Sequence, residues 1–305
     1  MRECIEVMAQ AFGDLQRGDL IQPLRVFYAP PGVNGGTMWM PAYRSKPKPM
    51  FGTKLLFVLS GNPARGLDSH QGQVMLADGE TGELRALLDA SAVTAIRTAA
   101  VSALATRLLS RETAQVLAVI GTGVQARKHL ESIPLVRPLS RILVAGRTFA
   151  HARQLAADVA GLTPCPIEAA QSAEAAVREA DIVVTATSST TPVIAGEWLR
   201  AGTHVNAVGA SRPGHWEIDP RIFERAVAFT DCRESMAAEA GDYLQAVSQG
   251  FITGPESVGE LGELVTGQRK GRTSADQVTL FRSLGLAIED LAAAEHIVSK
   301  AKAEK

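Results

Sequence analysis

Cysteine is scarce in this chain, with three residues in 305, and the three lie far apart. Cys4, Cys165 and Cys232 form no C-x-x-C pair, which argues against a disulfide framework and against a structural zinc site. Scattered free cysteines are typical of a reducing compartment. We therefore expect a cytoplasmic protein without a bound metal.

The chain also lacks an excess of charge, since 31 Lys and Arg residues face 32 Asp and Glu residues. This balance gives no reason to expect nucleic acid or an anionic membrane surface as a partner. No basic segment followed by an apolar one stands at the N-terminus, so we expect no signal peptide. We see no apolar run that approaches the length of a membrane span. Apolar residues make up 46%, enough for a substantial core in one large or two ordinary domains.

A glycine-rich stretch at residues 116–127, VLAVIGTGVQAR, organises the rest of the chain. Its first five residues are apolar and rich in β-branched side chains, which predicts a strand buried on both faces. The spacing G-x-G-x-x-A follows, in which Gly121 permits a tight turn, Gly123 leaves room for a pyrophosphate, and Ala126 lets a helix pack closely. Exposed amides at that helix start suit a phosphate. The stretch predicts dinucleotide binding, with an ordinary tight turn between strand and helix as the alternative.

The pattern of strands and helices changes at residue 115. A helix within residues 1–20 is followed by strands without intervening helices, which indicates an antiparallel sheet or half-barrel. From residue 115 onwards strands and helices alternate, as in a doubly wound parallel sheet. Apolar residues at helical spacing predict a last helix at about 274–300. The strands expected in the first region are 24–28, 37–43, 52–59, 72–77 and 84–89.

The residue that closes the second strand of the alternating region selects between NAD and NADP. An acidic residue there would accept a hydrogen bond from the ribose 2′-hydroxyl of NAD, but the stretch 142–148, ILVAGRT, contains no carboxylate. Arg147 and Thr148 offer a cation and a hydroxyl for a 2′-phosphate, although a solvated surface arginine is the alternative. We expect NADP(H) to be preferred, with NAD(H) possible. The predicted cofactor contacts are Gly121, Thr122, Gly123, Val124, Gln125, Arg147, Thr148, Thr185, Ala186, Thr187, Val208 and Gly209.

Three cations in the first region need an explanation. Arg25 and Lys54 lie in predicted strands among apolar neighbours. Arg97 falls near the centre of the apolar stripe of a helix that we expect from an N-cap at Ser91 to about Leu109. A buried guanidinium is costly unless it is paired. Its partner is either a protein carboxylate or a substrate carboxylate held through two parallel hydrogen bonds.

At this point the sequence resembles the ornithine cyclodeaminase and mu-crystallin family over nearly its whole length. The segments TAIRTAA at 94–100 and NAVGASRP at 206–213 are specific to that family, whereas the glycine loop is not. The other matching segments are 40–43, 53–54, 69–71, 88–90, 121–126, 204–205, 260–263 and 283–290.

The resemblance implies an α/β homodimer with a Rossmann-type sheet at 115–273. This sheet is inserted in a second α+β domain for substrate binding and dimerisation, formed by 1–114 and completed by the C-terminal helix at about 274–305. It also implies that Arg25, Lys54 and Arg97 gather around a substrate carboxylate, so we predict that Arg97 is a substrate clamp and not a fold-holding ion pair. Family members start with a strand before the first helix, so we expect a start that was truncated or assigned late.

The chemistry of the family depends on the residue after Gly209-Ala210. Cyclodeaminases carry an Asp there, suited to moving protons on an amine, whereas this chain has Ser211, a poor base without an activating partner. The Lys of the cyclodeaminase segment is His215 here. The resemblance therefore favours NAD(P)H-dependent reduction of the cyclic ketimines Δ1-pyrroline-2-carboxylate and Δ1-piperideine-2-carboxylate to L-proline and L-pipecolate.

Two residues are candidates for handling the proton of that reaction. Ser211 or an ordered water would hydrogen-bond the imine nitrogen, and His70 is a second candidate. Ornithine cyclodeaminase, alanine dehydrogenase and a mu-crystallin-like binding protein without turnover remain the alternative functions.

Overall fold

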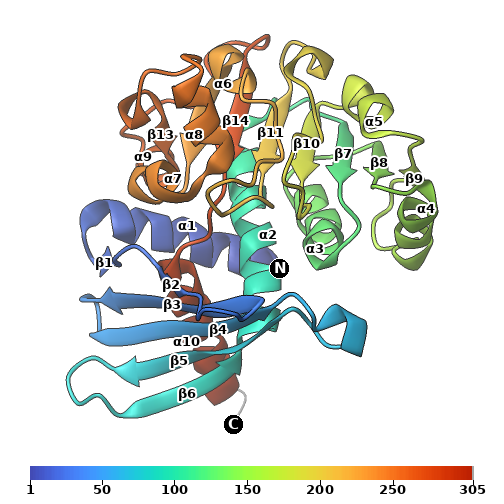
Figure 1. The fold of residues 1–305 in the computed structure, drawn as a ribbon. Helices are drawn as coiled ribbons and strands as arrows, with labels where there is room; N and C mark the ends of the chain where they lie inside the picture. Colours follow the sequence, from blue (N-terminus) through green and yellow to red (C-terminus); the bar gives the residue numbers. More distant parts are fainter. Residues whose placement is uncertain (304–305) are drawn as a thin grey trace. The chain divides into compact units, whose positions relative to one another are not determined.

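The computed structural model describes residues 1–303 and divides into two units (Figure 1). The Rossmann unit comprises Met1–Arg2 and Ala99–Leu284. The sheet unit comprises Glu3–Thr98 and the chain from Gly285 onward. The first boundary falls inside helix α2, Ala90–Leu109, so the expected bounds at 114 and 274 differ from those observed.

The sheet unit is an antiparallel sheet with helix α10 packed against β3, β4 and β5 (Figure 1). Its strands alternate between buried and exposed residues, as a sheet covered on one face requires. A Cβ on Gly52 of β4 would lie 2.8 Å from Leu291 of α10, so glycine permits this close packing. The strand order is β1-β3-β4-β5-β6, with β2 paired to β3. The elements are α1 (Arg2–Arg17), β1 (Leu20–Ile21), β2 (Val26–Tyr28), β3 (Gly35–Arg44), β4 (Met50–Leu59), η1 (Pro63–Arg65), β5 (His70–Asp78), β6 (Leu84–Asp89) and α10 (Ala287–Ala303).

The Rossmann unit contains a parallel sheet in the order β13-β12-β14-β11-β10-β7-β8-β9. The chain runs outward from β7 to β9 and then returns to β10 on the other side of β7, so the strand order reverses between β7 and β10. The strands are β7 (Val116–Ile120), β8 (Arg141–Ala145), β9 (Ile167–Ala169), β10 (Ile182–Thr185), β11 (His204–Ala207), β12 (Ala226–Thr230), β13 (Gly259–Glu260) and β14 (Val278–Arg282). The helices are α3 (Val124–Ser132), η2 (Ile133–Leu135), α4 (Phe149–Asp158), α5 (Ala173–Glu179), η3 (Gly196–Trp198), α6 (Ile222–Arg225), α7 (Arg233–Glu239), α8 (Gly241–Ser248), η4 (Pro255–Ser257) and α9 (Leu261–Val265).

Two details of the expected secondary structure are wrong. The first half of the expected last helix is strand β14, between β12 and β11, and α10 begins only at Ala287. All five residues of β14 are buried, and a fully buried strand gives the same apolar run as a buried helix. Ser91 does not cap α2, because the helix already includes Ala90 and the Ala92 N–H donates to Asp89 Oδ1 at 2.7 Å.

Helix α2 contradicts the expectation that no apolar run approaches the length of a membrane span. It is long and apolar enough to cross a membrane by length and composition, but 72% of its apolar window is buried inside the protein. A mostly buried core helix passes the same test, so the finding is weak evidence for a membrane span.

Candidate functional site

The glycine loop lies between the end of β7 and the start of α3. Gly121 has a φ of +133°, and a Cβ there would lie 2.3 Å from the carbonyl oxygen of Ala186. Its N–H donates to the Ala145 carbonyl at 2.8 Å. No other residue fits at this position, because the loop is pressed onto the segment that follows β10.

The space in front of α3 is open. Gly123 is the exposed N-cap of this nine-residue helix, and a Cβ on it would meet no atom within 4 Å. Val124 is 61% exposed, whereas Ala126 is buried against the strand side. Unpaired amides at a helix N-terminus with free space before them suit a phosphate. The residues present therefore fit the pyrophosphate of a dinucleotide.

The end of β8 is free of carboxylates, as the sequence shows. A Cβ on Gly146 would lie 2.8 Å from Thr122 Cγ2, so no acidic side chain fits there without displacing Thr122. Arg147 is exposed and forms no ion pair with the described residues. Thr148 is the N-cap of α4, and its hydroxyl makes no capping hydrogen bond. Both side chains are thus available to a ligand at this strand end.

The ends of β10 and β11 are joined by a residue that sequence reasoning missed. The Glu217 carboxylate accepts hydrogen bonds from the Thr187 N–H, from the Gly209 N–H at 2.5 Å and from Thr185 Oγ1 at 3.1 Å. Glu217 is fully buried, and burial raises the pKa of this carboxyl. The available signal was a lone acidic residue between the apolar Trp216 and Ile218.

In the sheet unit, the structure brings Arg97 and Lys54 to one carboxylate. Arg97 is 4% exposed, and its Nη1 lies 2.6 Å from Glu289 Oε2 while its Nε lies 3.0 Å from Asp290 Oδ1. Lys54 Nζ lies 2.7 Å from Asp290 Oδ2 and 3.3 Å from Thr94 Oγ1. The prediction that Arg97 has no fold-holding ion pair is therefore wrong. The spacing along α2 could not reveal this, because both carboxylates come from the start of α10.

Arg25 is linked to the cluster of Arg97, Lys54 and Asp290 by a hydrogen bond to the backbone of Gly285. Its Nη2 donates to the Gly285 carbonyl at 3.3 Å. A Cβ on Gly285, whose φ is +77°, would lie 2.6 Å from Arg97 Nη1, so only glycine fits between the two arginines. Arg25, Lys54 and Arg97 are thus all linked to Gly285 or Asp290.

Burial and pairing set the charges of this cluster. Burial lowers the pKa of Lys54 to about 8, although Asp290 opposes the shift. Burial also disfavours the charged form of Arg97, but Asp290 and Glu289 outweigh it and raise the pKa of Arg97 above its ordinary value. For Asp290 the two cations outweigh burial and lower its pKa. Arg97 and Asp290 are therefore ionised at neutral pH.

The two residues predicted for proton handling occupy different units. His70 is exposed at the start of β5, with its Nδ1 2.9 Å from Ser69 Oγ. Ser211 is half-buried in the loop after β11 of the Rossmann unit. Among residues 1–303, no group of three or more His, Cys, Asp or Glu side chains could hold a metal ion.

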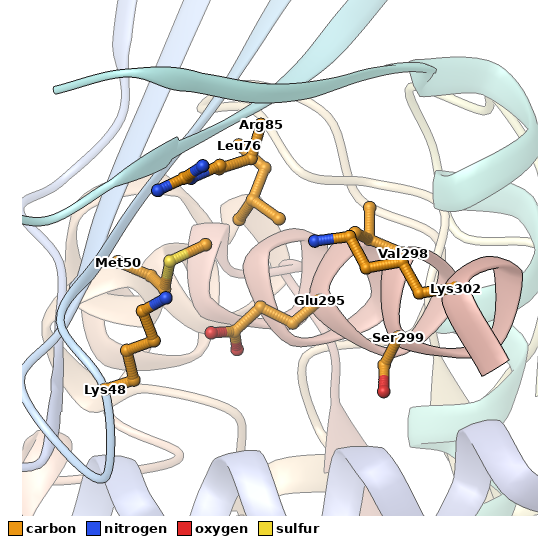
Figure 2. A pocket seen from close by; sticks show the side chains of 8 residues that line it. All are labelled: Lys48, Met50, Leu76, Arg85, Glu295, Val298, Ser299 and Lys302. Carbon is orange, nitrogen blue, oxygen red and sulfur yellow. The ribbon is translucent and has the colours of Figure 1, made fainter.

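A hollow of about 340 Å³ lies between the sheet and α10 of the sheet unit (Figure 2). None of its lining residues is a predicted site residue, and Arg85 and Glu295 in it are already paired with Asp78 and Arg44. It is lined by Lys48, Met50, Leu76, Arg85, Glu295, Val298, Ser299 and Lys302.

The parallel sheet and its open glycine loop at the strand reversal define the class of Rossmann-type dinucleotide-binding proteins. Residues 1–305 match the model of the ornithine cyclodeaminase/mu-crystallin family, and the chain belongs to this family.

Three relatives illustrate the similarity. The chain is 37% identical to ketimine reductase mu-crystallin of Mus musculus over 278 residues, which cover 91% of this chain and 84% of that protein. The structure of Thermococcus litoralis Δ1-pyrroline-2-carboxylate reductase in complex with NADH and L-proline superposes with a TM-score of 0.94 at 33% identity, covering 100% of this chain and 94% of that one. An archaeal alanine dehydrogenase dimer with bound NAD gives a TM-score of 0.92 at 31% identity, covering 100% and 92%.

Proposed function

We propose that this chain reduces cyclic ketimines with NAD(P)H, converting Δ1-pyrroline-2-carboxylate and Δ1-piperideine-2-carboxylate to L-proline and L-pipecolate. The names of the mouse and Thermococcus relatives support this reaction type. The observation that carries the proposal is the gathering of Arg25, Lys54 and Arg97 around Gly285 and Asp290. Such a group of cations suits the carboxylate of these substrates, which an arginine can hold through two parallel hydrogen bonds.

The reaction requires little more of the protein than position and charge. An iminium carbon is already electrophilic, so the chain has to orient the substrate and balance its carboxylate. When bound, the nicotinamide supplies the hydride. Ser211 or an ordered water would donate a hydrogen bond to the imine nitrogen, and His70 is the second candidate for this role.

Ser211 also argues for reduction over cyclodeamination. A carboxylate at this position would be able to move protons on an amine substrate, whereas a serine without an activating base cannot. Among the described residues, Ser211 forms no hydrogen bond with a His, Asp or Glu side chain.

We further propose that the protein prefers NADP(H). The exposed Arg147, the uncapped Thr148 and the missing carboxylate at the end of β8 support this preference. The two solved relatives described above hold NADH and NAD, so NAD(H) is the second cofactor to test.

A homodimer is the third part of the proposal. The face of the sheet opposite α10 exposes large apolar side chains that neighbour one another across the strands, such as Trp39 beside Leu55 and Met75 beside Leu87. A contiguous apolar patch of this kind marks an interaction surface. We propose that a second copy of this chain covers it, as in the dimeric relative.

The test of the activity is NADPH oxidation with a panel of substrates. We expect turnover with the two cyclic imines and none with pyruvate plus ammonia or with L-ornithine as the amine substrate. Release of ammonia from L-ornithine, or turnover restricted to pyruvate plus ammonia, would contradict the proposal.

A further inference from the structure

Glu217 is an unusual carboxylate, because it is fully buried and its hydrogen-bond donors are uncharged groups, while Arg282 acts on it only through electrostatic attraction. Its hydrogen bonds come from two backbone N–H groups and one hydroxyl, those of Thr187, Gly209 and Thr185. A buried carboxylate is tolerated only when its oxygens are satisfied in this way. The Rossmann unit therefore supplies hydrogen-bond donors that make a buried Glu217 carboxylate tolerable.

The partners of Glu217 belong to the ends of two neighbouring strands. Thr185 ends β10 and Thr187 follows it, whereas Gly209 follows β11. A Cβ on Gly209 would lie 2.0 Å from the Thr187 carbonyl oxygen, so the two loops touch and leave no room for a side chain. One carboxylate thus cross-links the loops after β10 and β11.

The segment that carries Glu217 is itself held in place. The Glu217 carbonyl accepts from the Val193 N–H at 2.7 Å, and Ile218 forms a parallel bridge with Ile194. The backbone that carries the Glu217 carboxylate is therefore fixed by hydrogen bonds to the neighbouring segment at 193–194.

The strand order assigns the loops after β10 and β11 to the nicotinamide half of a bound dinucleotide. In a doubly wound sheet the cofactor crosses the point of strand reversal, and the residue after the second strand takes the adenosine ribose. Here the reversal is between β7 and β10, and Arg147 follows β8 on the adenosine side. The other half of the cofactor therefore extends to the side of β10 and β11. The contact of Gly121 with Ala186 joins the glycine loop to that side.

We propose that Glu217 is a positioning residue for the nicotinamide half of the cofactor, because it fixes the Thr187 and Gly209 amides at the ends of β10 and β11. The inference rests on the proposed use of a nicotinamide cofactor. A carboxylate suits this role because each of its two oxygens accepts an amide, whereas a glutamine offers one acceptor and turns an NH₂ group towards the second N–H.

The experiment is a titration of Glu217→Gln with NADPH, NADH and ADP-ribose. ADP-ribose carries the adenosine half, the pyrophosphate and the second ribose but lacks the nicotinamide ring. We expect the Kd values for NADPH and NADH to rise roughly tenfold, while the Kd for ADP-ribose stays within about twofold of wild type. Glu217→Asp keeps two oxygens on a shorter stem, so we expect an intermediate Kd for NADPH.

Val177→Ala is the matched control, since Val177 is buried in α5 within the core of the same unit and its side chain forms no hydrogen bond. It should lower the melting temperature without changing the ratio of NADPH to ADP-ribose affinity. Hydrogen exchange at the Thr187 and Gly209 amides should be faster in Glu217→Gln and unchanged in Val177→Ala.

Three results would overturn the inference: equal weakening of NADPH and ADP-ribose, unchanged NADPH affinity, or a wild-type chain that binds neither NADPH nor NADH. Failure of the proposed function has a different signature. In that case NADPH binds and responds to Glu217→Gln as described, but wild-type protein oxidises NADPH with no cyclic imine.

Discussion

Arg97 Nε and Asp290 Oδ1 lie 3.0 Å apart, although the two residues are 193 positions apart in the sequence. Asp290 also lies 2.7 Å from Lys54, so one carboxylate at the start of α10 holds two cations of the proposed substrate site. The fold and the site of the sheet unit are therefore coupled at this residue. We therefore expect a change in the proposed substrate site to disturb packing as well.

We expect Arg97→Met to destabilise the protein by roughly 3–5 kcal/mol, because it strands the buried carboxylates Glu289 and Asp290. The melting temperature measures this loss, and kcat/KM for the imine should fall as well. Arg97→Lys should recover part of the stability but not the two-pronged geometry. A melting temperature equal to that of wild type would show that these ion pairs do not hold the unit together.

The pKa of Lys54 predicts opposite pH trends for activity and stability. Since burial lowers this pKa to about 8, Lys54 loses its charge as the pH rises through 8, and kcat/KM for a carboxylate substrate should fall. The unfolded chain keeps the ordinary pKa of 10.5 and binds more protons between pH 8 and 10.5, so the contribution of Lys54 to stability rises with pH in that window.

Lys54→Met is the control for both trends, because it removes the titrating group and keeps much of the stem. We expect the fall in kcat/KM above pH 8 and the rise in stability that is due to Lys54 to disappear together in this variant. If the wild-type profile persists in Lys54→Met, another group titrates.

Arg147→Ala should weaken NADPH binding much more than NADH binding. One charge-assisted contact to a 2′-phosphate contributes roughly 1.5–3 kcal/mol, and NADH lacks that phosphate. Fluorescence titration with both cofactors measures the difference. Equal losses for the two would remove Arg147 from the 2′-phosphate site.

Leu55→Lys should dissociate the proposed homodimer, because it places a charge in the middle of the exposed apolar face of the sheet. Light scattering at micromolar concentration should report a dimer for wild type and a monomer for the variant. Leu162→Lys is the control, since Leu162 is 46% exposed and belongs to the Rossmann unit, so it is not part of that sheet. A wild-type monomer would refute the dimer directly.

Much of the Rossmann unit was predictable because its signals are local. The strand at 116–120 begins and ends where the glycine-rich stretch predicts it. The glycine loop can be recognised from three small residues at a fixed spacing, because that spacing depends only on the local turn. The strand β14 was missed because full burial removes the period that distinguishes a strand from a helix.

The sequence by itself determined the family, the two kinds of sheet, the phosphate loop and the presence of an arginine on the buried face of α2. Only the tertiary structure decided what that arginine contacts, because Glu289 and Asp290 reach it from α10 at the far end of the chain. The same holds for Glu217, two of whose hydrogen-bond donors are backbone amides that no residue type encodes. Local patterns fix which side chains are buried, but the partner of a buried charge depends on which distant segments pack against it.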